Sequence, residues 1–285
     1  MSLLGPLCLS CALWIGTSLP LPAQTGPVPG WDQPGAPELG RDLDLRIAAM
    51  DQFGIAHACL MPSHSYARPR GTDDLRALND AVARLRKGAP DRFPVALGTT
   101  DLWLGADTVD EARRVLDDLG LDGLSWHHRL QGAYIDDARM HAVLDLLAER
   151  GKVAFVHVFA ESTFESPWRL ENLTEAHRDV TFVALDAFSS YDQSCWMGRL
   201  ATHHPNLWFD TAAMATNASL LARFVAEAGV ERLLLGTNCY GAAQPDFHPA
   251  AIDLVCASNE LSDAEKDAIL GGNARRLFGL AGAGA

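Results

Sequence analysis

The stretch Glu231-Arg232-Leu233-Leu234-Leu235-Gly236-Thr237-Asn238-Cys239-Tyr240 has a charged start, a solid apolar run and a small, polar end. A short apolar run bounded by turn residues is typical of a strand that is buried on both faces. Such strands carry chemistry at their carboxyl ends, because ligands bind there in barrels and in open α/β sheets. Thr237 and Asn238 stand at that end, so they are the first candidate site residues.

Upstream of this strand, apolar runs alternate with segments of helical periodicity along the chain. The predicted strands are 7–16, 55–61, 93–97, 123–126, 153–159, 180–185, 207–209 and 233–235. The predicted helices are 42–53, 73–86, 109–119, 137–150, 167–176, 195–203 and 220–228. Eight strands in this order predict one α/β domain over residues 1–285, folded as a (β/α)8 TIM barrel. An open doubly wound sheet is the alternative. Residues 16–20, however, lack the glycine-rich phosphate turn that follows the first strand of such a sheet.

Residues 17–40 follow the first predicted strand and are rich in proline and glycine. A loop of this length is typical of a functional lid or of a disordered segment. Because it leaves the carboxyl end of the first strand, we expect a lid over the barrel mouth, with Trp31 as its large apolar side chain. An untethered surface loop is the alternative.

The composition narrows the class of partner. The chain is 48% hydrophobic, which is enough for a sizeable core, and its net charge of -13 disfavours nucleic acid and anionic membranes. We therefore expect a small-molecule substrate, no nucleic acid and no membrane, and the composition leaves a homo-oligomer open. Six scattered cysteines without a Cys-x-x-Cys pair are typical of reduced thiols in a cytoplasmic protein.

The first residues have two interpretations. Residues 3–15 are apolar enough to imitate the core of a signal peptide. No Lys or Arg precedes Arg41, however, and the run is shorter than the roughly 20 residues of a membrane span. We therefore interpret this segment as a buried first strand, with a signal-like segment as the alternative.

A second diagnostic stretch lies near the end, at Ile269-Leu270-Gly271-Gly272-Asn273-Ala274-Arg275-Arg276-Leu277-Phe278-Gly279-Leu280. Together with residues 231–240, 50–55, 90–93 and 204–210, it resembles the amidohydrolase-related family of metal-dependent hydrolases and decarboxylases. The resemblance covers nearly the whole chain and implies a TIM barrel.

The resemblance also implies where a metal would be bound. The family usually uses His-x-His at strand 1, His at strand 5, often His at strand 6, and Asp at strand 8. Only His157, at strand 5, matches. Ala12 and Trp14 stand at the strand 1 positions, Asp186 at strand 6 and Asn238 at strand 8. An Asn side chain cannot accept a proton at neutral pH, so the metal site is degenerate.

Too few ligands therefore remain at the usual place, because catalytic metal sites normally keep three protein ligands. We predict an enzyme without a bound metal or other cofactor. The alternative is a divalent metal, Zn or Mn, at a site that His127 or His128 completes in a rearranged form.

Ionisable or amide side chains nevertheless stand at the ends of several predicted strands. They are His64, Asp101, His127, His128, His157, Asp186, Asp210 and Asn238. A single His at a strand end is more often structural than catalytic, and Asp101 or Asp210 could simply cap a turn. Their convergence on one end of a barrel favours a site over a set of structural residues.

The resemblance implies a hydrolase that acts on an ester, lactone or amide of a small carboxylated or cyclic molecule. Non-oxidative decarboxylation is the alternative reaction, and a non-catalytic barrel that binds a ligand or partner is the alternative from another class. We predict His157 or His127 as the acid or base, oriented by Asp186, whose charge raises the pKa of a neighbouring His. Asn238 would donate a hydrogen bond to an oxyanion or carboxylate. The predicted substrate-binding residues are His128, His64, Asp101, Asp210, Trp14 and Trp31.

Overall fold

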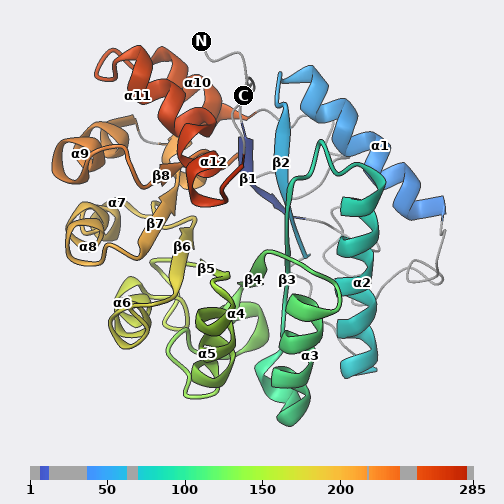
Figure 1. The fold of residues 1–285 in the computed structure, drawn as a ribbon. Coiled ribbons are helices and arrows are strands. Elements are labelled where there is room, and N and C mark those ends of the chain that lie inside the picture. Colours follow the sequence, from blue (N-terminus) through green and yellow to red (C-terminus); the bar gives the residue numbers. More distant parts are fainter. Residues whose placement is uncertain (1–6, 13–36, 63–69, 217, 238–248, 281–285) are drawn as a thin grey trace.

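The computed structural model describes residues 7–12, 37–62, 70–216, 218–237 and 249–280. Its strands form one sheet in which neighbours follow chain order from β1 to β8, and each consecutive pair is parallel. Figure 1 shows the helices arranged around the outside of these strands. Among the described residues no register pair joins β8 to β1, so a closed barrel stays a prediction.

The elements follow the predicted alternation of strand and helix. The strands are β1 (Leu7–Ala12), β2 (His57–Met61), β3 (Val95–Gly98), β4 (Gly123–Trp126), β5 (Val153–His157), β6 (Thr181–Leu185), β7 (Leu207–Asp210) and β8 (Leu233–Leu234). The α-helices are α1 (Pro37–Gln52), α2 (Thr72–Gly88), α3 (Ala106–Asp117), α4 (His128–Gln131), α5 (Met140–Arg150), α6 (Pro167–Ala176), α7 (Tyr191–Ser194), α8 (Met197–His203), α9 (Ala218–Ala228), α10 (Ala250–Ala257), α11 (Asp263–Asp267) and α12 (Asn273–Leu277). The remaining helical elements are the 3-10 helices η1 (Leu102–Leu104) and η2 (Ala212–Thr216) and the π-helix η3 (Ala268–Gly272).

The predicted lid is wrong at its carboxyl end, because α1 begins at Pro37 and residues 37–40 are helical. Proline suits the first turn of a helix, since its fixed φ matches and its missing N–H would have no partner there. The remaining part of the predicted lid, with Trp31, lies outside the described residues, and so does Trp14 of the predicted first strand.

Two further helices differ from the prediction. The short helices α4, after β4, and α7, before α8, were not expected, and the predicted helix 195–203 corresponds to α8, which begins two residues later. None of the described helices has the length and apolar character needed to cross a membrane.

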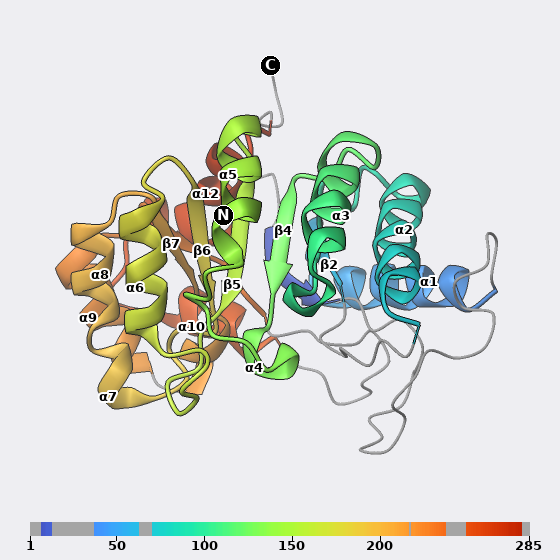
Figure 2. The same ribbon diagram turned by 90° about the horizontal axis from the view of Figure 1, so that it is seen from below.

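The strands are buried on both faces, with alternate residues in different parts of the core. In β5, Ala154 and Val156 pack into the large cluster that includes the surrounding helices. Val153 and Phe155 belong to a second cluster with inward residues of β2, β3, β6 and β8 and with Ala274 of α12. Figure 2 shows α12 at the end of the strands opposite α4. The next inward position of β5 is His157, at the carboxyl end of the strand.

Candidate functional site

The pairing of β4 with β5 brings two histidines together. Register pairs run from Gly123 with Val153 to Trp126 with Val156, so the next pair along is His127 with His157. A Cβ atom on Gly123 would overlap the backbone carbonyl of Val153, so glycine permits the close approach of the two strands. The two imidazole rings stack with centroids 3.6 Å apart and planes 15° apart.

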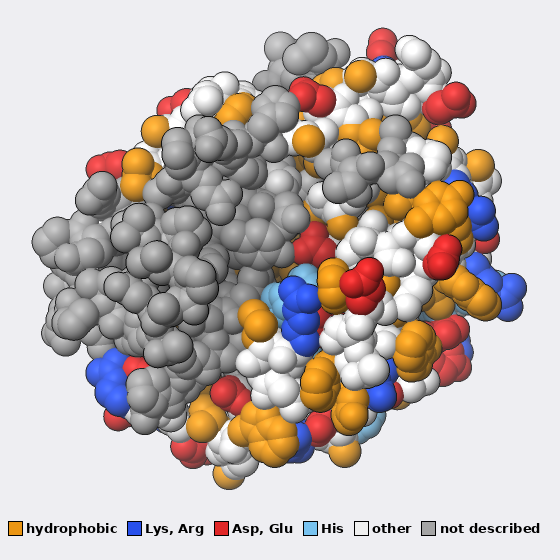
Figure 3. Space-filling view, turned by 180° about the vertical axis from the view of Figure 1, so that it is seen from behind, with side chains coloured by type: hydrophobic (Ala, Val, Ile, Leu, Met, Phe, Trp, Pro, Cys, Tyr) orange, Lys and Arg blue, Asp and Glu red, His pale blue; other side chains and the backbone are white. Residues whose placement is uncertain are grey.

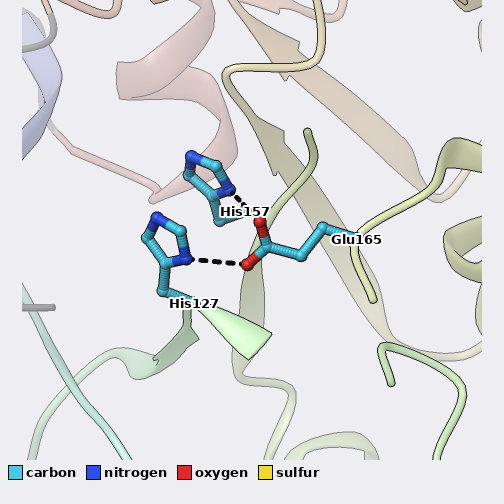
Figure 4. Close-up of side chains that lie close together, drawn as sticks. All are labelled: His127, His157 and Glu165. Carbon is cyan, nitrogen blue, oxygen red and sulfur yellow. Dashed lines mark hydrogen bonds and ion pairs between the residues drawn. The ribbon is translucent and has the colours of Figure 1, made fainter. Parts of the chain in front are cut away.

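Glu165 holds both rings from the same side (Figure 4). It lies in the loop between β5 and α6, and its side chain is 0% exposed. One carboxylate oxygen is 2.9 Å from Nδ1 of His157, within hydrogen-bond geometry, and the other is 2.7 Å from Nδ1 of His127. Figure 4 shows the other nitrogen of each ring pointing away from Glu165.

Asp186 lies on the opposite side of His157, with Oδ2 3.2 Å from Nε2. Asp186 therefore lies beside a histidine, and its role in orienting or charging that histidine stays a prediction. Asp186 directly follows β6 and has a left-handed backbone, with φ at 57°, a conformation that Asp tolerates better than most residues. Its backbone N–H donates to Oδ1 of Asp210, 3.0 Å away.

The two stacked rings differ in their electrostatics. Burial by itself lowers the pKa of His157, but hydrogen bonds to Asp186 and Glu165 outweigh it and raise that pKa to about 9. Burial also lowers the pKa of His127, and the contact with Glu165 does not offset it. The pKa of Glu165 would rise on burial, yet its contacts with His127 and His157 hold it well below the ordinary range. At neutral pH the site therefore contains an imidazolium at His157, a neutral ring at His127 and a carboxylate at Glu165.

Three other predicted site residues, His128, Asp101 and Asp210, are also buried. His128 has a fully buried side chain, and burial lowers its pKa to about 4. Asp101 accepts a hydrogen bond from the backbone N–H of Trp103 and so begins η1. Asp210 is buried and accepts from the backbone N–H of Asp186 and of Ala212. Their roles in substrate binding stay predictions, and His64 and Asn238 lie outside the described residues.

Two residues of this site were missed by the sequence reasoning. Glu165 comes from a loop, and neither strand nor helix periodicity indicates where its side chain points. Arg129 directly follows the two histidines after β4, and its backbone N–H donates to Glu165 at 3.0 Å. The only signal was that each residue stands between a predicted strand and the following helix, where site residues of a barrel occur.

The donor atoms present here fit a divalent metal. His127, His157 and Glu165 each offer one ligand atom, and these atoms lie within 4.8 Å of one another. Imidazole nitrogen and carboxylate oxygen are ligands that Zn and Mn accept. The prediction that no cofactor is bound is therefore weakened. The set resembles the rearranged alternative, with His127 as the residue that joins His157.

Comparison with known proteins places the chain in a family. Residues 17–280 match the sequence model of the family described as Amidohydrolase. The chain belongs to this amidohydrolase family. The resemblance found in the sequence is thereby confirmed over almost the whole chain.

Solved structures share the fold at low sequence identity. A dihydroxybenzoic acid decarboxylase from a Polaromonas species, with bound manganese and 2-nitroresorcinol, has a TM-score of 0.70 and 18% identity, covering 98% of each chain. A 4-oxalomesaconate hydratase from Rhodopseudomonas palustris has a TM-score of 0.72 and 14% identity, covering 96% of each chain. A 5-carboxyvanillate decarboxylase from Novosphingobium aromaticivorans, also with bound manganese, has a TM-score of 0.68 and 18% identity, covering 96% of this chain and 97% of the other.

One curated relative matches over a shorter segment. It is a 2-amino-3-carboxymuconate-6-semialdehyde decarboxylase from Dictyostelium discoideum, 28% identical over 93 residues. The matched segment is 32% of this chain and 26% of the relative, so it spans about a quarter of that protein's length. Two of the three compared structures therefore contain manganese, and two of them, like the curated relative, are decarboxylases.

Proposed function

We propose that this chain is a non-oxidative decarboxylase that releases CO2 from a small carboxylated molecule. The observation that carries the proposal is the position of His157 between the carboxylates of Glu165 and Asp186 at the carboxyl end of β5. The decarboxylases among the compared proteins support it. The sequence favoured hydrolysis of an ester, lactone or amide. None of the four compared proteins described above is named as an enzyme of that reaction.

Decarboxylation makes two demands on a site. When the carbon–carbon bond breaks, the carboxylate leaves as neutral CO2 and its bonding electrons remain on the substrate carbon. A proton must then be delivered to that carbon. A buried cationic acid can stabilise the developing negative charge and then donate the proton.

His157 meets these demands through the groups on its two nitrogens. Glu165 at Nδ1 fixes the plane of the ring, and Asp186 at Nε2 keeps a proton on that atom. His127 stacks on the ring and excludes water from one of its faces. We therefore assign proton delivery to Nε2 of His157, with Asp186 as the group that orients the ring, and His157 regains its proton from water after each turnover.

The residues that would hold a divalent metal are His127, His157 and Glu165. His157 would bind the ion only as a neutral imidazole, so the metal-bound site and the metal-free site with its imidazolium are alternative states. When bound, such an ion would supply Lewis-acid polarisation of a substrate oxygen. We further propose that β8 closes onto β1 and that residues 1–285 form one domain.

The test of function is a measurement of CO2 release from a panel of hydroxybenzoates and unsaturated amino acids, with and without added Mn2+. An ester, lactone and amide panel is assayed in parallel. General acid catalysis typically contributes about 10²–10⁴-fold, so His157→Gln and Asp186→Asn should lose activity on that scale. His203→Gln, which changes an exposed histidine on α8, is the matched control and should retain it. Hydrolysis without CO2 release would contradict the proposal in favour of the hydrolase, and binding without any turnover would favour the non-catalytic barrel.

The metal assignment has a readout that does not depend on activity. Protein dialysed against EDTA is titrated with Mn2+, and free Mn2+ is followed by electron paramagnetic resonance. We expect about one ion per chain, with weaker binding in His127→Ala and unchanged binding in His203→Gln. Equal binding by wild type and His127→Ala would place the ion elsewhere.

A further inference from the structure

Arg129 presents a positively charged group beside the histidine pair. It lies in the short helix α4, two residues after His127. Its guanidinium carbon is 4.4 Å from the centre of the Phe159 ring, and that ring is 6.4 Å from the ring of His157. On the face drawn in Figure 3, Lys or Arg atoms lie against His atoms near the centre.

The contacts of Arg129 leave most of its donors available. Its Nε is 3.5 Å from Oε2 of Glu165, which is an ion-pair distance but longer than a regular hydrogen bond. Among the described residues, neither Nη atom has a hydrogen-bond partner. The side chain is 36% exposed, whereas that of Glu165 is 0% exposed. The guanidinium is therefore fixed on its inner side and open to solvent on its outer side.

We propose that Arg129 anchors a carboxylate group of the substrate at the entrance to the site. This deepens the proposed function, because it assigns the residue that selects an anionic substrate. A chain with a net charge of -13 repels small anions overall, so binding a carboxylate requires a local cation. Arg suits this task, because its planar donors match the two oxygens of a carboxylate. Stacking on Phe159 orients the plane before the ligand arrives.

The competing explanation is that Arg129 only neutralises the buried charge of Glu165. Glu165 already contacts His157, which carries the opposite charge. An arginine that served only this purpose would influence stability and would not distinguish an anionic ligand from a neutral one. The two explanations therefore differ in ligand selectivity.

The experiment compares 2-hydroxybenzoate with its neutral amide, 2-hydroxybenzamide, by isothermal titration calorimetry on the purified full chain. A hydrogen-bonded charge pair implies that Arg129→Gln weakens binding of the benzoate about 10- to 100-fold and leaves the amide within about 2-fold. Arg129→Lys should recover part of the loss. The matched control is Arg169→Gln, because Arg169 also stacks on an aromatic ring, Tyr134, but pairs with Asp136 instead of the histidine site.

Three results would overturn the anchor. In the first, Arg129→Gln weakens binding of the benzoate and the amide equally. In the second, Arg129→Gln weakens binding of neither. In the third, the wild-type protein does not bind the benzoate more tightly than the amide. The CO2 assay separates this inference from the proposed function. Selective binding without CO2 release from any carboxylate would refute the decarboxylase and keep the anchor, while CO2 release that Arg129→Gln leaves unchanged would refute only the anchor.

Discussion

The charge on His157 makes the stability of the metal-free protein depend on pH in a defined window. The unfolded chain has an ordinary His pKa of 6.5 at this position, whereas the folded protein raises it to about 9. Between these values the folded state binds a proton that the unfolded state has released. The contribution of His157 to the free energy of unfolding is therefore complete below pH 6.5 and is lost as the pH rises through 9.

The magnitude follows from the size of the pKa difference. One pKa unit corresponds to about 1.4 kcal/mol, so the shift of His157 from 6.5 to about 9 is worth about 3 kcal/mol. His128 acts in the opposite direction, because burial lowers its pKa to about 4. The folded state then binds fewer protons than the unfolded state between pH 4 and 6.5, so stability rises with pH in that range. Together the two histidines predict maximum stability close to pH 6.5.

The assay is urea unfolding of EDTA-dialysed protein at a series of pH values, followed by tryptophan fluorescence. Wild type should lose about 3 kcal/mol of unfolding free energy between pH 6.5 and 9.5, and His157→Gln should lack this slope. His203→Gln, which changes an exposed histidine, should keep it. If His157→Gln does not fold, Asp186→Asn removes one of the two hydrogen bonds and should flatten the slope in part. Parallel curves for wild type and both variants above pH 6.5 would refute the assigned charge of His157.

Two further changes test how the site is built. Glu165→Gln should lower the free energy of unfolding by about 3 kcal/mol, because it leaves a buried imidazolium with a single carboxylate partner. Glu161→Gln in the same loop changes an exposed residue and should have little effect, so equal melting temperatures for both variants would contradict the assigned contacts of Glu165. Gly123→Ala should destabilise the protein by about 1–3 kcal/mol, because its Cβ would overlap the Val153 carbonyl, and an unchanged unfolding midpoint in urea would argue against close pairing of β4 with β5.

The order of strands and helices could be predicted because the strands are buried on both faces. Such strands appear as continuous apolar runs, and the bounds of β4 and α6 match the prediction to the residue. Errors arose where one residue type occurs both in loops and at helix ends, and where a helix is very short. Pro37 was assigned to a loop, although proline also begins helices, and the four residues of α7 are too few to show a helical period in the sequence.

The site could be predicted where it depends on strand ends and not where it depends on loops. His127 and His157 occupy inward positions at the ends of adjacent strands, so periodicity and register indicate both. Glu165 meets the backbone of Arg129 across 36 positions of sequence, and its position depends on the path of a loop. The same loop also contains Glu161, which is exposed, and the sequence does not distinguish the two acids.

The departures from the family pattern at Asp186 and Asn238 are related. By resemblance, Asp186 stands where relatives have a histidine, and Asn238 stands where they have an aspartate. The exchange places a carboxylate next to His157 at β6 and removes one from β8. An aspartate also tolerates the left-handed backbone at this position, where the buried carboxylate of Asp210 accepts the hydrogen bond of its N–H. The carboxylate beside the β5 histidine is thus supplied from the end of the neighbouring strand β6, at the position where the family pattern has a histidine.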